Sequence, residues 1–470
     1  MSEQLHDFGM VGLGVMGRNF LLNVADHGFS IAGLDTNEEQ VAALKEEAEG
    51  KVVFSTSDMK AFVASLKTPR KIMLLVPAGK VVDLVIKGLL EHVAAGDLII
   101  DGGNSFFEDT DRRLAMLKEK KVHFLGVGVS GGAKGARFGP SIMPGGAKGA
   151  YNKVRKILEA VSAKVNGEPC VAYMGKGSAG NYVKMVHNGI EYAMMQLLAE
   201  SYDILKNIGG LSNEELHQAY TKYNRGKLKS FLVEITAAIF TQKDELAKGM
   251  LIDKILDKAK QKGTGKWTSQ NAMDFGIPVP TIDSAVTMRG LSSLKQERLA
   301  AEPLLKVRTT KEKVDKTALV KEVGEALFFA FITAYAQGMA LLADASKEKK
   351  YSLDLEATAR IWRGGCIIRA ALLENIRKAF STNPELPNLM VDPDFAKLLK
   401  RAQKPLRSML KKAIDAGIPS MAFSSALAYF DAYRSGRLPL NLVQAQRDHF
   451  GSHTYERTDR EGIFHTDNWA

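Results

Sequence analysis

The sequence has little cysteine and no recognisable export signal. Only Cys170 and Cys366 occur in 470 residues. Two thiols are too few for a disulfide framework, which indicates a reducing compartment. The segment 1–17 lacks the basic start and the cleavage site of a secretory signal. We therefore expect a cytoplasmic protein.

An uninterrupted membrane-length apolar run is also missing. The stretch 326–343 approaches spanning length, but Thr333, Tyr335, Gln337 and Gly338 interrupt it, and no second such segment follows. These features favour a helix buried in a large α-domain and predict no membrane partner.

Nucleic-acid motifs are absent as well. The net charge is +11, from 64 basic and 53 acidic residues, yet the basic residues are scattered and no aromatic-interleaved basic stripe occurs. Segment 261–268 resembles a phosphate loop but lacks its spacing, because Trp267 follows Gly265 and Lys266. Lys262, flanked by glycine, can still reach a small anion. Phosphorylated metabolites fit this charge at least as well as nucleic acid.

A glycine cluster near the amino terminus predicts a dinucleotide site. An apolar run over 8–11 is followed by Gly12, Gly14 and Gly17 in GxGxxG spacing, then by a helical pattern to about His27. A second apolar strand, 29–34, ends at an acid. This order of strand, glycines, helix, strand and acid is typical of a Rossmann fold. A plain structural glycine turn is the alternative.

Strand and helix patterns then alternate. Buried strands are predicted over 71–76, 97–101 and 123–131, with helical stretches over 79–94 and 108–120 between them. Alternation implies a parallel, doubly wound sheet, whose ligands gather at the carboxyl ends of the strands. Turns fall there at 76–79, 101–105 and 128–132.

From about residue 178 the chain reads as helical. Amphipathic stretches are predicted over 178–207, 213–224, 227–241, 244–260, 315–345 and 353–378. Segments 211–235 and 351–376 resemble one another, each with a Ser suited to an N-cap (Ser212, Ser352) and an Arg-Gly pair between helices, which suggests an internal repeat. The last 30 residues are polar and irregular, and we expect a tail that must dock to be ordered. The predicted architecture is a Rossmann-type domain (1–177), a large all-α domain (178–436) and an extended tail (437–470).

One predicted helix carries an unusual polar stripe. Lys184, His187, Asn188 and Glu191 share one face, with Tyr192 beside them. A solvated polar face is the ordinary interpretation. The other sides of this helix are apolar, so it should be buried, and a buried polar stripe needs partners or a ligand.

Six separated motifs resemble the decarboxylating 6-phosphogluconate dehydrogenases almost from end to end. They are GLGVMGRN, DGGNS, GVSGGAKGARFGPSIMPGG, KMVHNGIEY, QKGTGKWT and QAQRDHFGSHTYE. The resemblance implies oxidation of 6-phospho-D-gluconate at C3, loss of CO2 and formation of ribulose 5-phosphate. It also implies a homodimer in which the tail of one subunit enters the active site of the other, and no metal.

The resemblance assigns roles to residues of this chain. Lys184 would act as the base, neutral through burial beside cationic groups, and Glu191 as the acid that protonates the enediol. The remaining substrate residues fall into carboxylate, hydroxyl and phosphate contacts: Asn104, Ser130, Gly131, Gly132, His187, Asn188, Tyr192, Lys262, Arg289, Arg447 and His453. The cofactor residues would be Gly12, Leu13, Gly14, Val15, Met16, Gly17, Asp35, Thr36, Asn37, Val76, Pro77, Ala78 and Asn104.

The chain departs from the family where the second strand ends. The family usually has Asn-Arg-Thr there, and its Arg grips the 2′-phosphate of NADP, but this chain has Asp35, Thr36 and Asn37. Asp35 would repel that phosphate, so we predict a preference for NAD, with NADP as the other possible cofactor. Smaller departures are Ala133-Lys134 in place of an acidic pair, Asn181 in place of a His just before the catalytic helix, and Phe106 in place of Glu.

Two rival interpretations remain from the sequence. Another β-hydroxyacid dehydrogenase, acting without decarboxylation, would share the glycine motif and the lysine but leave Lys262, Arg289, Arg447 and His453 unexplained. A basic nucleic-acid-binding protein would bind RNA or DNA in a salt-sensitive way.

Overall fold

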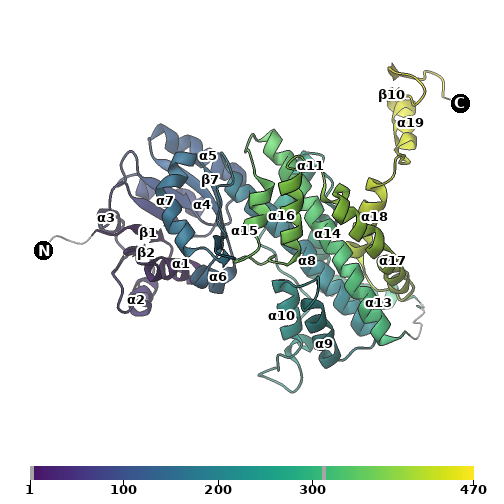
Figure 1. Cartoon of the computed structure of the whole chain (residues 1–470), viewed down its shortest axis with the longest axis horizontal. Coiled ribbons are helices and arrows are strands. Elements are labelled where there is room, and N and C mark those ends of the chain that lie inside the picture. The colour runs from purple at the N-terminus through teal and green to yellow at the C-terminus, as the bar shows by residue number, and fades with distance from the viewer. Residues whose placement is uncertain (1–4, 308, 310–313, 470) are drawn as a thin grey trace.

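The computed structural model describes residues 5–307, 309 and 314–469. A layered α/β part, a helical part and a projecting carboxyl-terminal arm follow one another along the chain (Figure 1).

The α/β part is built on a seven-stranded sheet with the order β3-β2-β1-β4-β5-β6-β7. The pairs from β3 to β6 are parallel, and β7 runs antiparallel to β6. The strands are β1 Phe8–Val11, β2 Ile31–Leu34, β3 Val53–Thr56, β4 Lys71–Leu74, β5 Leu98–Asp101, β6 His123–Ser130 and β7 Ser141–Gly146. The predicted fold class, a Rossmann-type domain followed by a large helical domain, is confirmed.

Two strands of this sheet escaped prediction for physical reasons. Edge strand β3 is mostly half-buried, so it lacks a continuous apolar run. Strand β7, SIMPGG, is fully buried but contains Pro and Gly, which are unusual in strand interiors.

Seven helices accompany the strands, and α1 begins directly after the glycine motif. They are α1 Val15–Asp26, α2 Glu38–Glu47, α3 Met59–Ala64, α4 Lys80–Leu89, α5 Phe107–Glu119, α6 Gly132–Phe138 and α7 Lys148–Val161. A short antiparallel pair, β8 Lys164–Val165 and β9 Glu168–Pro169, precedes the change to helices.

Two long helices form the centre of the helical part. Helix α8, Ala179–Asn207, packs against α14, Lys316–Glu348. Helix α14 is apolar and long enough to cross a membrane, but 89% of its most apolar window is buried inside the protein. It is a core helix, as the sequence indicated. Around them lie α11 Thr264–Asp274, α12 Pro280–Ser293, α13 Lys295–Leu304, η2 Leu389–Val391, α17 Pro393–Asp415 and α18 Met421–Tyr433.

The two similar segments form paired helices that meet each other. Helices α9 Asn213–Asn224 and α10 Phe231–Ile239 come from the first, and α15 Leu355–Ile361 and α16 Leu372–Thr382 from the second. Ser230 bridges Ala370 in antiparallel fashion. Ser212 caps α9 with a capping box, but Asp354, rather than the expected Ser352, caps α15.

Three helix predictions were wrong or too long. Segment 244–260 holds only the 3-10 turn η1 Leu251–Asp253, because its polar, lysine-rich sequence packs no continuous face. Segment 227–241 yields only α10, and a turn at 362–371 divides 353–378 into two helices.

The tail is more regular than predicted. It contains α19 Leu440–Gly451 and a hairpin of β10 Tyr455–Glu456 with β11 Ile463–Phe464. Buried Asp448 organises it by accepting hydrogen bonds from Thr454, His465, Thr466 and Trp469. This arm stands off the body (Figure 1).

Candidate active site

The glycine motif makes a tight turn between β1 and α1. Gly12 has φ +95°, and a Cβ there would lie 2.6 Å from the Leu75 carbonyl oxygen. A Cβ on Gly17 would lie 1.9 Å from the Gly12 oxygen, so both positions require glycine. At Gly14 a Cβ would meet nothing within 4 Å, which leaves the helix N-terminus open to an anion. These features fit the pyrophosphate of a dinucleotide.

A cavity of about 660 Å³ opens beside this turn. Its lining combines the α1 turn, the loops that follow β4 and β5, and the start of α11. The lining residues include Met16, Val76, Pro77, Ala78, Gly79, Gly103, Asn104, Phe106, Lys262 and Trp267. Predicted cofactor residues from three separate turns thus share one cavity with a cation.

The acid at the end of β2 already has partners. Asp35 accepts hydrogen bonds from the backbone N–H groups of Leu13 (2.7 Å) and Asn37 (2.9 Å). Asn37 in turn caps α2 through Glu39. Asp35 therefore also stabilises the glycine turn, through the hydrogen bond from Leu13. The sequence did not predict this structural role.

The polar stripe of α8 is a connected, buried network. Lys184 Nζ donates to Asn188 Oδ1 at 2.7 Å, and His187 Nδ1 lies 3.0 Å from the same oxygen. Because an amide oxygen only accepts, His187 carries its proton on Nδ1, and its Nε2 can accept from the Ser130 hydroxyl at 3.3 Å. Glu191 Oε2 lies 3.9 Å from His187 Nδ1. The alternative of a solvated polar face is excluded.

Burial moves the two titratable ends of this stripe in opposite directions. Burial lowers the pKa of Lys184, although Glu191 and Cys366 oppose that change. The predicted cause was therefore wrong in part, since burial rather than neighbouring cations favours the neutral amine. Burial raises the pKa of Glu191, against Lys184 and Arg289. Burial and Lys184 lower the pKa of His187, which keeps the imidazole neutral.

Glycines place α8 directly on the sheet. A Cβ on Gly128 of β6 would lie 2.4 Å from Lys184 Cβ, and one on Gly180 would lie 2.2 Å from the Gly126 carbonyl oxygen. The first turns of α8 therefore rest on β6 and β7 at backbone contact.

The turn after β6 faces this stripe. Ser130 ends the strand, and Gly131 (φ +122°) and Gly132 (φ +62°) lead into α6. Gly131 is so close to the Gly365 carbonyl that a Cβ would lie 2.5 Å from it. The Ser130 hydroxyl, the glycine turn and His187 thus lie together.

Arg289 lies at the Tyr192 end of the stripe. The Arg289 guanidinium lies 3.4 Å from the centroid of the Tyr192 ring and donates to the Lys260 carbonyl. Gly265 allows α11 to approach Tyr192, since a Cβ there would lie 2.3 Å from the ring. Lys262, three residues before Gly265, lines the cofactor cavity. Tyr192 and Arg289 are therefore brought together.

Arg447 and His453 are not brought to this site within one chain. Both belong to the arm, and among the described residues Arg447 donates a hydrogen bond to Gln444, three positions away. Helix α19 lies off the body, apart from α8 (Figure 1).

Sequence reasoning missed three residues that support the stripe. Thr264 accepts from Asn188 Nδ2 at 3.1 Å, and the Trp362 ring packs edge-on against His187 with centroids 5.5 Å apart. Cys366 is buried close enough to influence Lys184. Thr264 lies inside the QKGTGKWT motif, but Trp362 and Cys366 come from the segment 351–376, where no local pattern links them to α8.

Comparisons with known proteins cover both parts of the chain. Residues 7–175 match the NAD binding domain of 6-phosphogluconate dehydrogenase, and residues 180–469 match the 6-phosphogluconate dehydrogenase C-terminal domain. The chain belongs to the 6-phosphogluconate dehydrogenase family. The family predicted from the motifs, and its oxidoreductase class, are confirmed.

Individual relatives are similar over nearly their full length. The NADP(+)-dependent, decarboxylating 6-phosphogluconate dehydrogenase of Bacillus subtilis is 51% identical, with 99% of each chain covered. A decarboxylating relative from Lactococcus lactis is 49% identical, with 98% of each covered. The solved 6-phosphogluconate dehydrogenase of Plasmodium falciparum, known with NADP+ and with 6-phosphogluconate, has a TM-score of 0.95 at 46% identity, with 98% of this chain and 99% of that chain covered.

These relatives contradict the predicted preference for NAD. The Bacillus subtilis relative is named as NADP(+)-dependent, and the Plasmodium falciparum cofactor is NADP+. The prediction counted Asp35 as a free repulsive charge, whereas both its oxygens accept backbone hydrogen bonds.

Proposed function

We propose that the chain oxidises 6-phospho-D-gluconate at C3 and decarboxylates it to D-ribulose 5-phosphate and CO2. The observation that carries this proposal is the stripe on α8, where a buried lysine with a lowered pKa and a carboxyl with a raised pKa share one face. These two directions favour a neutral base and a protonated acid on the same helix face. A nicotinamide dinucleotide held by the lining of the adjoining cavity would supply the acceptor for the hydride from C3.

Lys184 acts first as a base. The neutral amine takes the proton of the C3 hydroxyl as the C3 hydrogen leaves as hydride, and a C3 ketone results. The amine is then an ammonium that polarises this ketone. Asn188 holds the Lys184 nitrogen in place at 2.7 Å.

Decarboxylation follows because the carboxylate is β to the new ketone. The C1–C2 bond breaks, CO2 departs, and the electron pair moves to the ketone oxygen, which takes the proton from Lys184. Glu191 then protonates the terminal carbon of the enediol while an enediol hydroxyl returns its proton to Lys184. The turnover ends with Lys184 protonated and Glu191 ionised, and one proton passes from Lys184 to Glu191 before the next cycle.

The ends of the substrate match the two ends of the site. Ser130 and the Gly131–Gly132 turn suit the carboxylate end, and His187 and Asn188 suit the hydroxyls. Tyr192, Arg289 and Lys262 suit the phosphate, which arginine grips with paired donors. Asn104 lines the cavity, and we assign it to the contact between cofactor and substrate.

We also propose that the arm of a second copy completes the phosphate end with Arg447 and His453. Both residues lie on an arm that stands off its own body and exposes Leu442, Val443 and Phe450. Exposed apolar side chains on a projecting element favour burial against a partner. A homodimer in the cytoplasm is part of this proposal.

Steady-state turnover tests the proposal. Reduced cofactor and CO2 are measured with 6-phosphogluconate and, in parallel, NAD+ or NADP+. Equal yields of both products support it. Reduction of cofactor without CO2, or activity on 3-hydroxyisobutyrate instead, would favour a β-hydroxyacid dehydrogenase that does not decarboxylate. Salt-sensitive RNA binding without turnover would reject enzymatic function.

A further inference from the structure

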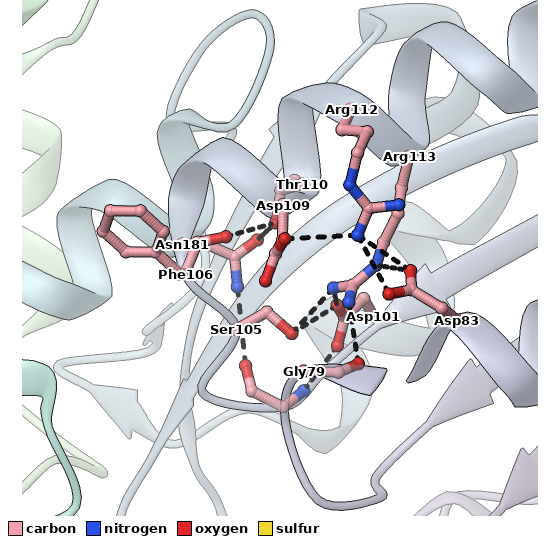
Figure 2. Close-up of polar contacts among 11 residues, drawn as sticks. Gly79, Asp83, Asp101, Ser105, Phe106, Asp109, Thr110, Arg112, Arg113 and Asn181 are labelled. Atoms are coloured by element: carbon pink, nitrogen blue, oxygen red, sulfur yellow. Dashed lines mark hydrogen bonds and ion pairs between the residues drawn. The ribbon is translucent and has the colours of Figure 1, made fainter. Parts of the chain in front are cut away.

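A buried arginine ties two walls of the cofactor cavity together. Arg113 of α5 is fully buried, and Figure 2 shows its guanidinium between Asp83, Asp101 and Ser105. It donates to the Gly79 carbonyl at 3.0 Å, to Asp83 at 2.8 Å, and to Asp101 and Ser105 at 3.2 Å each. The planar guanidinium of Arg113 therefore connects the loops after β4 and β5.

The same network continues through the loop after β5. Asp101 Oδ1 accepts from the Gly103 N–H at 3.1 Å, and Asp101 Oδ2 accepts from the Ser105 hydroxyl at 2.6 Å. This fixes the backbone on both sides of Asn104, which lines the cavity.

Asn181 connects this loop to the catalytic helix. It is buried in the first turn of α8, three residues before Lys184. Its amide nitrogen donates to the Gly103 carbonyl at 3.4 Å, and its amide oxygen accepts from the Thr110 hydroxyl at 3.0 Å (Figure 2). The two contacts fix the orientation of the amide.

The fold reserves space for this side chain. A Cβ on Gly126 of β6 would lie 2.1 Å from Asn181 Oδ1 and 2.6 Å from Thr110 Cγ2. Asn181 was expected just before the catalytic helix, but it lies within it. Because Asn181 and Lys184 lie one turn apart on the same helix, a shift of the Asn181 backbone also shifts the position of Lys184.

We propose that Asn181 is a positioning residue that sets the floor of the cofactor cavity against Lys184. Arg113 anchors this floor from the opposite side. The consequence is a fixed separation between the C3 hydrogen of the substrate, its base and the hydride acceptor. The inference rests on the proposed function.

Two variants test this role. Asn181→Ala removes both contacts, whereas Thr110→Val removes only the hydroxyl that orients the amide. For Asn181→Ala we expect kcat to fall by about tenfold to a hundredfold, since small misplacements of reacting groups have effects of that size. KM should stay within about threefold, because hydride transfer rather than binding is affected. Thr110→Val should shift kcat in the same direction by a smaller factor.

A matched control separates positioning from stability. Asn23 is equally buried and donates to the carbonyls of Ala136 and Val161, away from α8. Asn23→Ala should lower Tm and leave kcat per folded enzyme unchanged. Tm and the deuterium isotope effect on kcat, with substrate labelled at C3, are measured for all four proteins. The isotope effect of Asn181→Ala should be at least as large as that of the wild type.

The outcomes are distinct. If Asn181→Ala lowers only Tm, as Asn23→Ala does, the positioning role is wrong. If Asn181→Ala does not fold, Thr110→Val decides, and an unchanged kcat overturns the role. A wild-type protein without turnover of 6-phosphogluconate overturns the proposed function itself.

Discussion

At the scale of single residues, burial shifts the pKa values of Lys184 and Glu191, the proposed base and acid. Both lie on α8, and burial favours the uncharged form of each. Their mutual attraction opposes this effect, so water exclusion must outweigh it. The sequence placed both on one helical face and predicted burial beside cationic groups as the cause of the lysine shift. Burial lowers the pKa, but the neighbours Glu191 and Cys366 raise it, and spacing alone could not identify those neighbours.

The pH dependence of kcat/KM should be bell-shaped. Lys184 must be neutral, so activity should fall as pH decreases through its lowered pKa. Glu191 must be protonated, so activity should fall as pH increases through its raised pKa. A pH–rate profile of the wild type checks both limbs. A profile without an acidic limb would contradict the role of Lys184.

Removing either group should affect a different step. Lys184→Met should abolish hydride transfer, because it removes the base. Among the described residues, no other buried amine donates a hydrogen bond to Asn188 and could replace it. Glu191→Ala should allow a first burst of reduced cofactor and then slow product formation, because carbon protonation comes last. Stopped-flow absorbance of the reduced cofactor measures both. Loss of the burst in Glu191→Ala with binding intact would contradict this division.

At the scale of elements, the contact of α8 with the sheet depends on absent side chains. A Cβ on Gly180 would lie within 2.6 Å of three backbone atoms, and backbone cannot move aside cheaply. Gly180→Ala should therefore destabilise the fold by about 3 kcal/mol or more. Gly149 in α7 has nothing within 4 Å, so Gly149→Ala should stabilise by about 0.5–1 kcal/mol. Denaturant unfolding compares them, and equal effects would contradict the packing argument.

A carboxyl group of α8 lies at the start of α18. Glu200 of α8 accepts the N–H groups of Ala422 (2.8 Å) and Phe423 (3.0 Å). Burial raises its pKa to about 7, against these two hydrogen bonds. The folded state then binds more protons than the unfolded state between about pH 4.5 and pH 7, so this contribution to stability falls as pH rises through that range.

Glu200→Gln should remove this dependence. Between pH 5 and pH 8 the wild type should lose about 2–3 kcal/mol of unfolding free energy more than the variant does. Urea titrations of both proteins at the two pH values measure the difference. Parallel losses in the two proteins would show that Glu200 does not titrate in this range.

Elements with a strong local signal were predicted closely, and the others were not. The range of α9, 213–224, was predicted to the residue, because a capping box and an amphipathic pattern coincide there. Helix 244–260 failed because amphipathic spacing without a packing partner does not make a helix. The turn at 362–371 places Trp362 against His187. It depends on tertiary contacts that no local sequence pattern predicts.

At the scale of the whole molecule, the arm separates two of the predicted phosphate ligands from the rest of the site. Arg447 and His453 were assigned through resemblance, and a single chain does not bring them to Lys184. The resemblance assigned these residues to the site of a second copy, but no spacing or periodicity in the sequence indicates by itself which copy they serve.

Subunit mixing tests that arrangement. Lys184→Met and Arg447→Ala homodimers should each be nearly inactive. After unfolding and refolding together, mixed dimers should contain one intact site, which restores about a quarter of wild-type activity for random pairing. Refolding each variant alone is the control. No recovery in the mixture would mean that each arm serves its own chain.

The projecting arm has a consequence for how the protein behaves in dilute solution. If each site needs the Arg447 and His453 side chains of a second copy, the fraction of active sites follows the dimerisation equilibrium, and specific activity depends on the protein concentration. At protein concentrations below the dissociation constant of the dimer, turnover should then be lost although each subunit stays folded. Addition of excess Lys184→Met protein, which is inactive but has an intact arm, should restore the turnover of the diluted wild type.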